Sequence, residues 1–168
     1  TATFRELALP TVTTQAVTAI ITTTATGNGN ITDLGVPNPT EHGMVWSMSL
    51  DPTITDSKTT DGAVSATGAF TSSITRLTAG TLYYVRAYAT NTAGTSYGAQ
   101  MSFTTFILPT LTTTVASAIT STAASSGGNI SSDGGTAVTV RGVCWSTSVT
   151  PTIADSKTTD GAGTGAFT

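Results

Sequence analysis

Residues 82–89 show the clearest alternation of side-chain types in the chain. The run is mostly aromatic, β-branched or small, and no Pro or Gly interrupts it, which predicts a long β-strand. Side chains alternate between the two faces of a strand. One face therefore carries Tyr83, Val85, Ala87 and Ala89, and the other carries Leu82, Tyr84, Arg86 and Tyr88. The first face is small and apolar, so we expect it to lie in a core.

Five further strands are predicted before residue 106, at residues 11–17, 22–31, 42–49, 68–77 and 99–105. In the last of them, Met101 and Phe103 are expected to alternate inward. Turn-rich segments at residues 33–40 and 51–62 separate the strands. Thr and Val favour strands, Gly and Asn supply turns, and runs typical of helices are absent. The pattern predicts an all-β fold.

The chain repeats itself with a period of 99 residues, since Pro10-Thr-Val-Thr-Thr recurs from Pro109 (109 − 10 = 99) and Trp46 recurs as Trp145 (145 − 46 = 99). From residue 10 to residue 62, 27 of 53 positions are identical to those 99 residues later. Such self-similarity predicts a tandem array. After Gly161 the second copy drops two residues, so that its GAFT matches the first with an offset of 97.

The repeat also sets the expected domain boundaries. The same offset carries residues 2–10 onto 101–109, with Phe4 falling on Phe103, so residues 1–9 are interpreted as the last strand of a preceding repeat. Residues 10–105 are interpreted as a complete repeat. Residues 106–168 are interpreted as a second repeat that is truncated before its final strands. The chain is then a window cut from a longer array.

The spacing of Leu77, Thr81, Tyr83, Val85 and Ala87 resembles the tyrosine corner and following strand of fibronectin type III domains. The turn from Asn91 to Gly94 resembles that family's N-x-x-G turn. The third-strand tryptophans, Trp46 and Trp145, are instead placed as in immunoglobulin domains. The resemblance implies tandem antiparallel β-sandwiches of fibronectin type III or Ig-like type, like the repeats of large secreted or surface proteins of bacteria. The structural residues it implies are Trp46, Trp145, Leu77, Tyr83 and Gly94.

The composition limits the classes of partner. Only 9% of the residues are charged, the net charge is −3 and the sequence pI is about 4.7. The six Lys and Arg residues are scattered singly, so nucleic acid and anionic membranes are disfavoured as partners. The longest apolar runs fall far short of the roughly 20 residues that a spanning helix needs, so membrane insertion is not expected.

No catalytic constellation is evident. His42 is the sole histidine and its counterpart in the second copy is Arg141, so we interpret it as a solvent-facing strand residue. Cys144 is the sole cysteine, which excludes an internal disulfide, and beside Trp145 it is expected to pack in a core rather than to act as a reactive thiol. We therefore expect a protein that is not an enzyme and needs no cofactor.

The acidic residues Asp51, Asp56 and Asp61 recur every fifth position, and oxygen ligands of this kind can hold calcium. However, their spacing is not that of an EF-hand, and Asp51 becomes Thr150 in the second copy. Turn formation explains these residues better, so no metal site is expected. The repeated lysines Lys58 and Lys157 are interpreted as exposed turn residues rather than as partners in a covalent Lys–Asn bond.

Three functional hypotheses remain. The first is a non-catalytic spacer or stalk of a long extracellular or cell-surface protein, whose partners are neighbouring repeats of the same or an identical chain. The second is an adhesive or carbohydrate-binding module that contacts a glycan or surface protein through Tyr84, Arg86 and Tyr88, provided that these side chains are exposed in a row. The third is a fibre subunit assembled by β-strand exchange.

Overall fold

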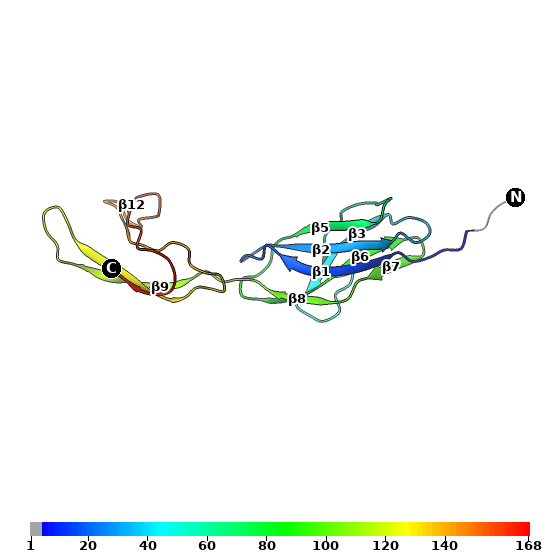
Figure 1. Cartoon of the computed structure of the whole chain (residues 1–168), viewed down its shortest axis with the longest axis horizontal. Helices are drawn as coiled ribbons and strands as arrows, with labels where there is room; N and C mark the ends of the chain where they lie inside the picture. The colour runs from blue at the N-terminus through cyan, green and yellow to red at the C-terminus, as the bar shows by residue number, and fades with distance from the viewer. Residues whose placement is uncertain (1–4) are drawn as a thin grey trace. The chain divides into compact units, whose positions relative to one another are not determined.

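The computed structural model describes residues 5–168, and these form two compact units: unit 1 ends at Phe106, and unit 2 is Ile107–Thr168. All regular elements in the described residues are β-strands, and the sheets are antiparallel (Figure 1). None of these residues forms a helix that could cross a lipid bilayer. Phe4, which the repeat aligns with Phe103, lies outside the described residues.

Unit 1 contains two sheets. The first has the strand order β1-β2-β5, and the second has the order β4-β3-β6-β7, with β8 also pairing with β6 (Figure 1). The strands are β1 (Thr11–Thr18), β2 (Ala25–Asp33), β3 (Glu41–Ser47), β4 (Ser57–Lys58), β5 (Gly68–Ile74), β6 (Leu82–Asn91), β7 (Gly94–Tyr97) and β8 (Met101–Thr104). The central position of β6 follows from its composition, because a strand between two neighbours must offer an unbroken row of backbone donors.

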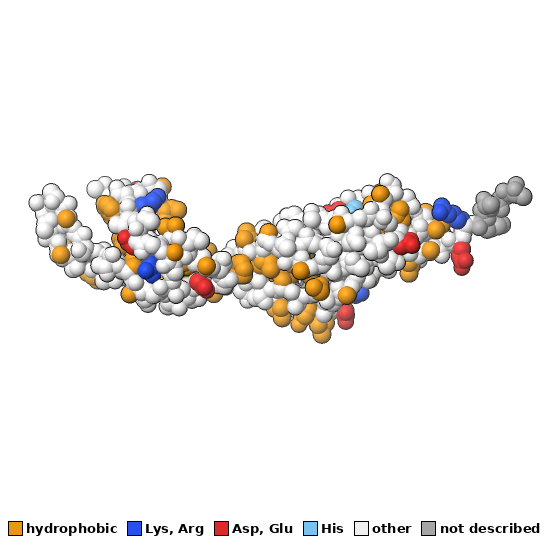
Figure 2. All heavy atoms as spheres, in the orientation of Figure 1, with side chains coloured by type: hydrophobic (Ala, Val, Ile, Leu, Met, Phe, Trp, Pro, Cys, Tyr) orange, Lys and Arg blue, Asp and Glu red, His pale blue; other side chains and the backbone are white. Residues whose placement is uncertain are grey.

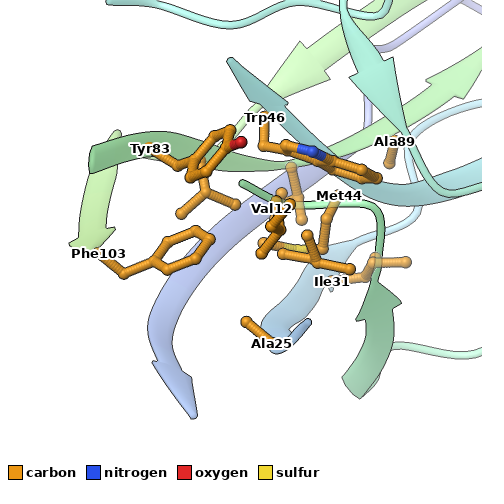
Figure 3. Packing of buried hydrophobic residues seen from close by; sticks show 12 residues of the cluster. Val12, Ala25, Ile31, Met44, Trp46, Tyr83, Ala89 and Phe103 are labelled. Carbon is orange, nitrogen blue, oxygen red and sulfur yellow. The ribbon is translucent and has the colours of Figure 1, made fainter. Parts of the chain in front are cut away.

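One core lies between the two sheets of unit 1. Val12 and Ile31 reach it from the first sheet, and Trp46 and Phe103 from the second (Figure 3). The predicted inner face of β6 is confirmed, since its four residues are at most 6% exposed: Tyr83, Val85, Ala87 and Ala89. Gly27 and Gly29 of β2 face the same core, where a Cβ at either position would collide with Met44 or Phe70.

Several strand limits differ from those predicted. The strand expected at residues 68–77 ends at Ile74, and Arg76 then adopts a positive φ of 61° before the chain turns into Leu77. Phe103 is buried, but Met101 is 38% exposed, because it lies at the start of the edge strand β8. The expectation that both side chains point into the core is therefore correct only for Phe103.

Unit 2 also contains two sheets, with the strand orders β13-β10-β9 and β11-β12. Its strands are β9 (Thr110–Ser117), β10 (Ser125–Ser132), β11 (Cys144–Trp145), β12 (Ser156–Lys157) and β13 (Gly165–Phe167). Residues 141–148, which the 99-residue repeat aligns with the strand predicted at residues 42–49, thus contain a strand of only two residues. Its counterpart β3 is held along its length by β6, and residues 107–168 contain no strand in that position.

Within each unit, residues at corresponding positions of the repeat have corresponding strand partners. Thr14 pairs with Gly29 in unit 1, and Thr113 pairs with Gly128 in unit 2. Trp46 pairs with Ser57, and Trp145 pairs with Ser156. Phe70 lies opposite Gly29, and Phe167 lies opposite Gly128, with the offset of 97 that follows the two-residue gap. The periodicity of the sequence is therefore also a periodicity of strand register.

Candidate functional site

The turn-rich segment of unit 1, residues 51–61, covers part of the outer face of the β3–β6 sheet, and we call it the strap. Its backbone is fixed to the sheet at several points. The N–H of Asp51 donates to Gln100 Oε1 (2.5 Å), that of Ile54 donates to Tyr97 Oη (3.0 Å), and that of Thr59 donates to the carbonyl of Met44 (2.9 Å). These hydrogen bonds fix the position of the strap.

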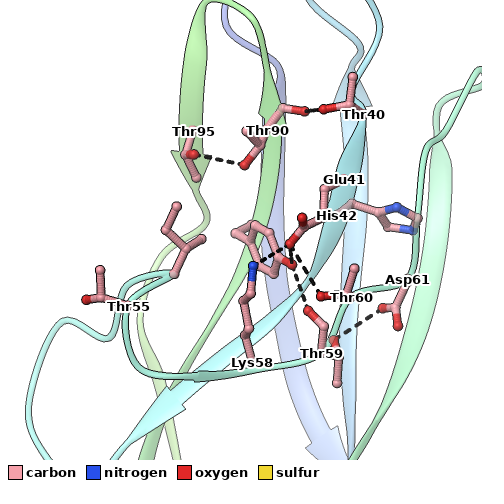
Figure 4. A network of polar contacts seen from close by, with 12 residues as sticks. Thr40, Glu41, His42, Thr55, Lys58, Thr59, Thr60, Asp61, Thr90 and Thr95 are labelled. Atoms are coloured by element: carbon pink, nitrogen blue, oxygen red, sulfur yellow. Dashed lines mark hydrogen bonds and ion pairs between the residues drawn. The ribbon is translucent and has the colours of Figure 1, made fainter.

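Tyr88 lies beneath the strap and is completely buried. Its hydroxyl oxygen is 2.5 Å from Glu41 Oε1 and 2.7 Å from the carbonyl oxygen of Thr59 (Figure 4). Burial, and secondly the hydrogen bond to the Glu41 carboxylate, raise the pKa of the Tyr88 hydroxyl well above its usual range. Tyr88 is therefore neutral, and its single hydroxyl proton lies between the Glu41 carboxylate on β3 and the Thr59 carbonyl on the strap.

Glu41 is the centre of this polar network. Lys58 Nζ donates to Glu41 Oε1 at 2.6 Å, and the Thr60 hydroxyl lies 3.4 Å from the same oxygen (Figure 4). The hydrogen bond from Lys58, followed by the one from Tyr88, lowers the pKa of the Glu41 carboxyl. The Lys58 and Glu41 side chains are about one third exposed, so water screens the ion pair. The arrangement connects the strap to β3 and β6.

The predicted binding row of Tyr84, Arg86 and Tyr88 is not exposed as that hypothesis requires. Tyr88 is buried by the strap, and Tyr84 is half-buried. Arg86 donates from Nε to the carbonyl of Gly98 (3.0 Å), and its guanidinium lies 4.7 Å from the centre of the Tyr97 ring. All three residues do share the outer face of β6, but other parts of unit 1 occupy that face.

The residues that the fibronectin resemblance picks out lie as follows. Trp46, Leu77 and Tyr83 are buried, and the Tyr83 hydroxyl accepts a hydrogen bond from the Thr78 N–H (3.0 Å) across the turn before β6. Gly94, with φ at 141°, starts β7 directly after the β6 turn. Trp145 is 53% exposed, in contrast with the 8% of Trp46.

His42 is not solvent-facing as the sequence suggested. It is only 8% exposed, its ring packs edge-on against Phe70 at 4.8 Å, and its Nδ1 lies 2.8 Å from the carbonyl oxygen of Gly62. The reason is its position opposite Ala89, which places it on the inner face of β3. The histidine is thus a buried polar residue on the inner face of β3.

The acidic residues of the strap accept hydrogen bonds from nearby groups of unit 1. Asp56 Oδ2 accepts from the Thr53 N–H (2.9 Å), and the Asp61 carboxylate accepts from the Ser72 hydroxyl. Residues 5–168 contain no group of three or more His, Cys, Asp or Glu side chains arranged to hold a metal ion. Lys58 is exposed as expected, although it lies in the two-residue strand β4 rather than in a turn, and it pairs with Glu41.

Unit 2 has a partly open apolar face. Cys144, expected in a core, is half-buried there. Leu111, Val140 and Ile153 are all more than half exposed, and they line a groove together with Val143 and Phe167. Hydrophobic side chains are accordingly visible on the surface of unit 2 in Figure 2.

The network of Glu41, Lys58 and Tyr88 was not identified from the sequence. Its members are 17 and 30 residues apart along the chain (58 − 41 and 88 − 58) and meet only through strand pairing. The repetition of Lys58 as Lys157 was the one available signal, and the change of Glu41 to Val140 obscured it. Comparison with known proteins matches this chain to no family model and to no curated protein.

Proposed function

We propose that this chain is a stretch of tandem β-sandwich modules of fibronectin type III or Ig-like type that serves as a non-catalytic spacer in a long extracellular or cell-surface protein. The observation that carries the proposal is that equivalent residues of the two units have equivalent strand partners. Trp46 and Trp145, and Gly29 and Gly128, occupy equivalent pairing positions in the two units. Repetition of strand register, rather than of one surface residue, is what a spacer built from tandem modules requires.

The distribution of polar side chains in unit 1 supports the same proposal. The tyrosine and arginine side chains that a binding surface would use are committed to intramolecular contacts, as with Tyr88 to Glu41 and Arg86 to Gly98. Few charges remain for a ligand. The low charge of 9% also limits attraction between neighbouring modules, whose stability then rests on separate cores.

The test is an in-frame deletion of residues 10–108, one repeat period, from the natural polypeptide that carries this sequence, after its intact mass has been measured. A spacer predicts that the remaining modules fold and that cell attachment is kept. Forced unfolding should lose one extension step of roughly 36 nm, since 99 residues span about 3.6 Å each. The matched control deletes residues 10–58, which removes β1 to β4 and leaves β5, and the edge of β6 that pairs with β3, without partners.

The proposal fails if the one-period deletion abolishes attachment to cells or glycans while display at the surface is unchanged. That result would instead support an adhesive module. It would also fail if the natural polypeptide has the 16.9 kDa mass of this chain alone, because a spacer must connect other parts.

A further inference from the structure

The same tripeptide motif occurs in both units, on the central strand of a three-stranded sheet. Asn30-Ile31-Thr32 lies in β2, and Asn129-Ile130-Ser131 lies in β10. Both fit the pattern Asn-x-Ser/Thr, in which the asparagine amide accepts a glycan in exported proteins. The two copies differ at the third position, and the change from Thr to Ser keeps the hydroxyl group that the pattern requires.

Strand alternation places the reactive groups of the motif on the outer face of the sheet. Ile31 and Ile130 point into their units and are 1% and 5% exposed. Because successive side chains alternate, the asparagine and the hydroxyl residue on either side of each isoleucine share the opposite face. The hydroxyl residue is exposed in both units, and the asparagine is half-buried in β2 and exposed in β10. The buried isoleucine therefore directs both ends of the motif away from the core.

The neighbours of both asparagines leave room for a sugar. Asn30 pairs with Thr13 on β1 and with Ala69 on β5. In unit 2 the asparagine pairs with a threonine and an alanine at the corresponding positions, Thr112 and Ala166. All four partners are exposed, and none has a side chain longer than that of threonine. A substituent on either asparagine would therefore meet no bulky side chain directly opposite it.

The amide of Asn30 is available for modification, in contrast with that of the asparagine two residues before it. Asn28 Nδ2 donates to the carbonyl of Ala16 (2.7 Å) and to Thr18 Oγ1 (3.1 Å), where the register of β1 shifts. The backbone carbonyl of Asn30 accepts from a threonine hydroxyl, but its side-chain amide has no hydrogen-bond partner among the described residues. The motif thus falls on the asparagine whose amide makes no hydrogen bond that a glycan would break.

Strand β5, which lies beside Asn30, forms an edge of its sheet. It pairs with β2 on one side and has no strand partner on the other among the residues that the structure describes. Its sequence, GAFTSSI, contains neither a charged residue nor a proline, which are common means of keeping edge strands from pairing with other chains. A bulky, hydrated glycan on the adjacent strand would provide that protection.

We propose that Asn30 and Asn129 are N-glycosylation sites. The inference rests on the extracellular location in the proposed function, because N-glycans are added to exported chains. The donor is an oligosaccharide linked to a polyisoprenyl diphosphate. A bond forms between the asparagine Nδ2 and C1 of the first sugar, while the bond between C1 and the diphosphate oxygen breaks. The proton lost from Nδ2 passes to the released lipid diphosphate.

The test maps the glycopeptides of the natural polypeptide, expressed in its own host and released from intact cells by an external protease. We expect peptides that contain Asn30 or Asn129 to carry added mass in whole sugar units, located on the asparagine by fragmentation. Thr32→Ala should remove the glycan from Asn30 and leave that on Asn129. The matched control Thr32→Ser should keep both glycans, and so should Asn28→Gln, which lies on the same face but outside the motif.

The inference is overturned if both asparagines are unmodified in the released polypeptide, or if Thr32→Ala keeps its glycan on Asn30. It is also overturned if Thr32→Ser loses that glycan, because the hydroxyl group is then not what the transferase reads. If Thr32→Ala does not reach the cell surface, the peptides of the unaltered chain still decide the question. Unmodified asparagines in a released polypeptide leave the spacer proposal standing. If intact cells release no peptide of the chain, the extracellular location fails and both proposals fail with it.

Discussion

At the scale of single residues, β6 carries two buried tyrosines that face opposite sides of its sheet. Tyr83 points into the core and receives the Thr78 N–H, whereas Tyr88 points outward and lies under the strap. A buried tyrosine needs a partner for its hydroxyl, and each of these side chains ties β6 to a different segment. A tyrosine hydroxyl on each face of β6 thus connects the strand to a neighbouring segment.

Tyr83→Phe is expected to lower the free energy of unfolding of unit 1 by about 1–2 kcal/mol, because the Thr78 N–H loses its acceptor in a partly buried hydrogen bond. Urea denaturation followed by the fluorescence of Trp46 in a Trp145→Phe background measures the effect. Tyr84→Phe on the half-buried outer face is the matched control and should change stability by less than about 0.5 kcal/mol. Equal losses for the two variants would contradict the role of the Tyr83 hydroxyl.

Glu41 should make the stability of unit 1 depend on pH in the acid range. Its pKa is lowered in the folded chain, so its contribution is fully present above the ordinary value of 4.5 and is lost as the pH falls through the lower folded value. Glu41→Gln is expected to flatten this acid limb of the stability curve. Denaturation midpoints between pH 2 and pH 6, compared with those of Glu6→Gln, provide the measurement. An unchanged acid limb in Glu41→Gln would rule out the assigned network.

Sequence periodicity correctly predicted which side chains of β6 are buried on its inner face, but it did not predict the burial of Tyr88 on its outer face. Tyr83, Val85 and Ala87 are buried because alternation alone places them between two sheets. The burial of Tyr88 depends on the strap, which no local pattern of β6 can reveal. His42 was misplaced for a related reason, since a polar residue on an inner face breaks the alternation by which faces are recognised.

At the scale of elements, the strap depends on a glycine in β3. Gly43 has a φ of 157°, and a Cβ on it would lie 2.7 Å from the Thr59 carbonyl oxygen, so a side chain here would push the strap away. Gly142 has the same relation to the Thr158 carbonyl in unit 2. Both copies thus keep a glycine where strap and strand approach most closely, although the residue before it changes from His42 to Arg141.

Gly43→Ala is expected to destabilise unit 1 by about 1–3 kcal/mol, because the new methyl group must displace backbone of the strap. Displacement also admits water to Tyr88, so the pKa of its hydroxyl should move down toward the ordinary value of 10.0. Absorbance titration of tyrosine ionisation detects this movement. Ser57→Ala, at an exposed strap position, serves as the control, and a titration curve of Gly43→Ala identical to that of the control would contradict the proposed contact.

The sequence predicted the presence of the strands better than it predicted their lengths. The run at residues 141–148 has the same pattern as residues 42–49, yet only Cys144 and Trp145 form a ladder. A strand is defined by its neighbours, and β11 has one neighbour where β3 has two. The difference therefore lies in tertiary pairing and not in local propensity.

At the scale of the whole molecule, the two units differ greatly in burial. Of the apolar side chains that are buried in the described residues, all but Ile130 belong to unit 1. Strand β9 is exposed along its full length, whereas its counterpart β1 buries Val12. The two units therefore share sequence and strand register but differ in how many apolar side chains they bury.

Limited proteolysis should separate the units by stability. We expect a nonspecific protease to cut within residues 107–168 first and to leave a resistant fragment that ends near Phe106, because opening of unit 2 exposes little additional apolar surface. Intact-mass analysis of the digest over time identifies the fragment. The prediction is wrong if cleavage within unit 1 is as fast as cleavage within unit 2.

The preserved register also has a genetic consequence. A recombination event that joins any codon from 10 to 62 to the codon 99 positions later adds or removes one whole period without changing the partner of any strand. An exchange within the final strand instead shifts the length by 97 codons. Alleles of the gene should therefore differ in length mainly by steps of 97 to 99 codons, and intermediate lengths should be rare because they misalign Gly29 with the ring of Phe70.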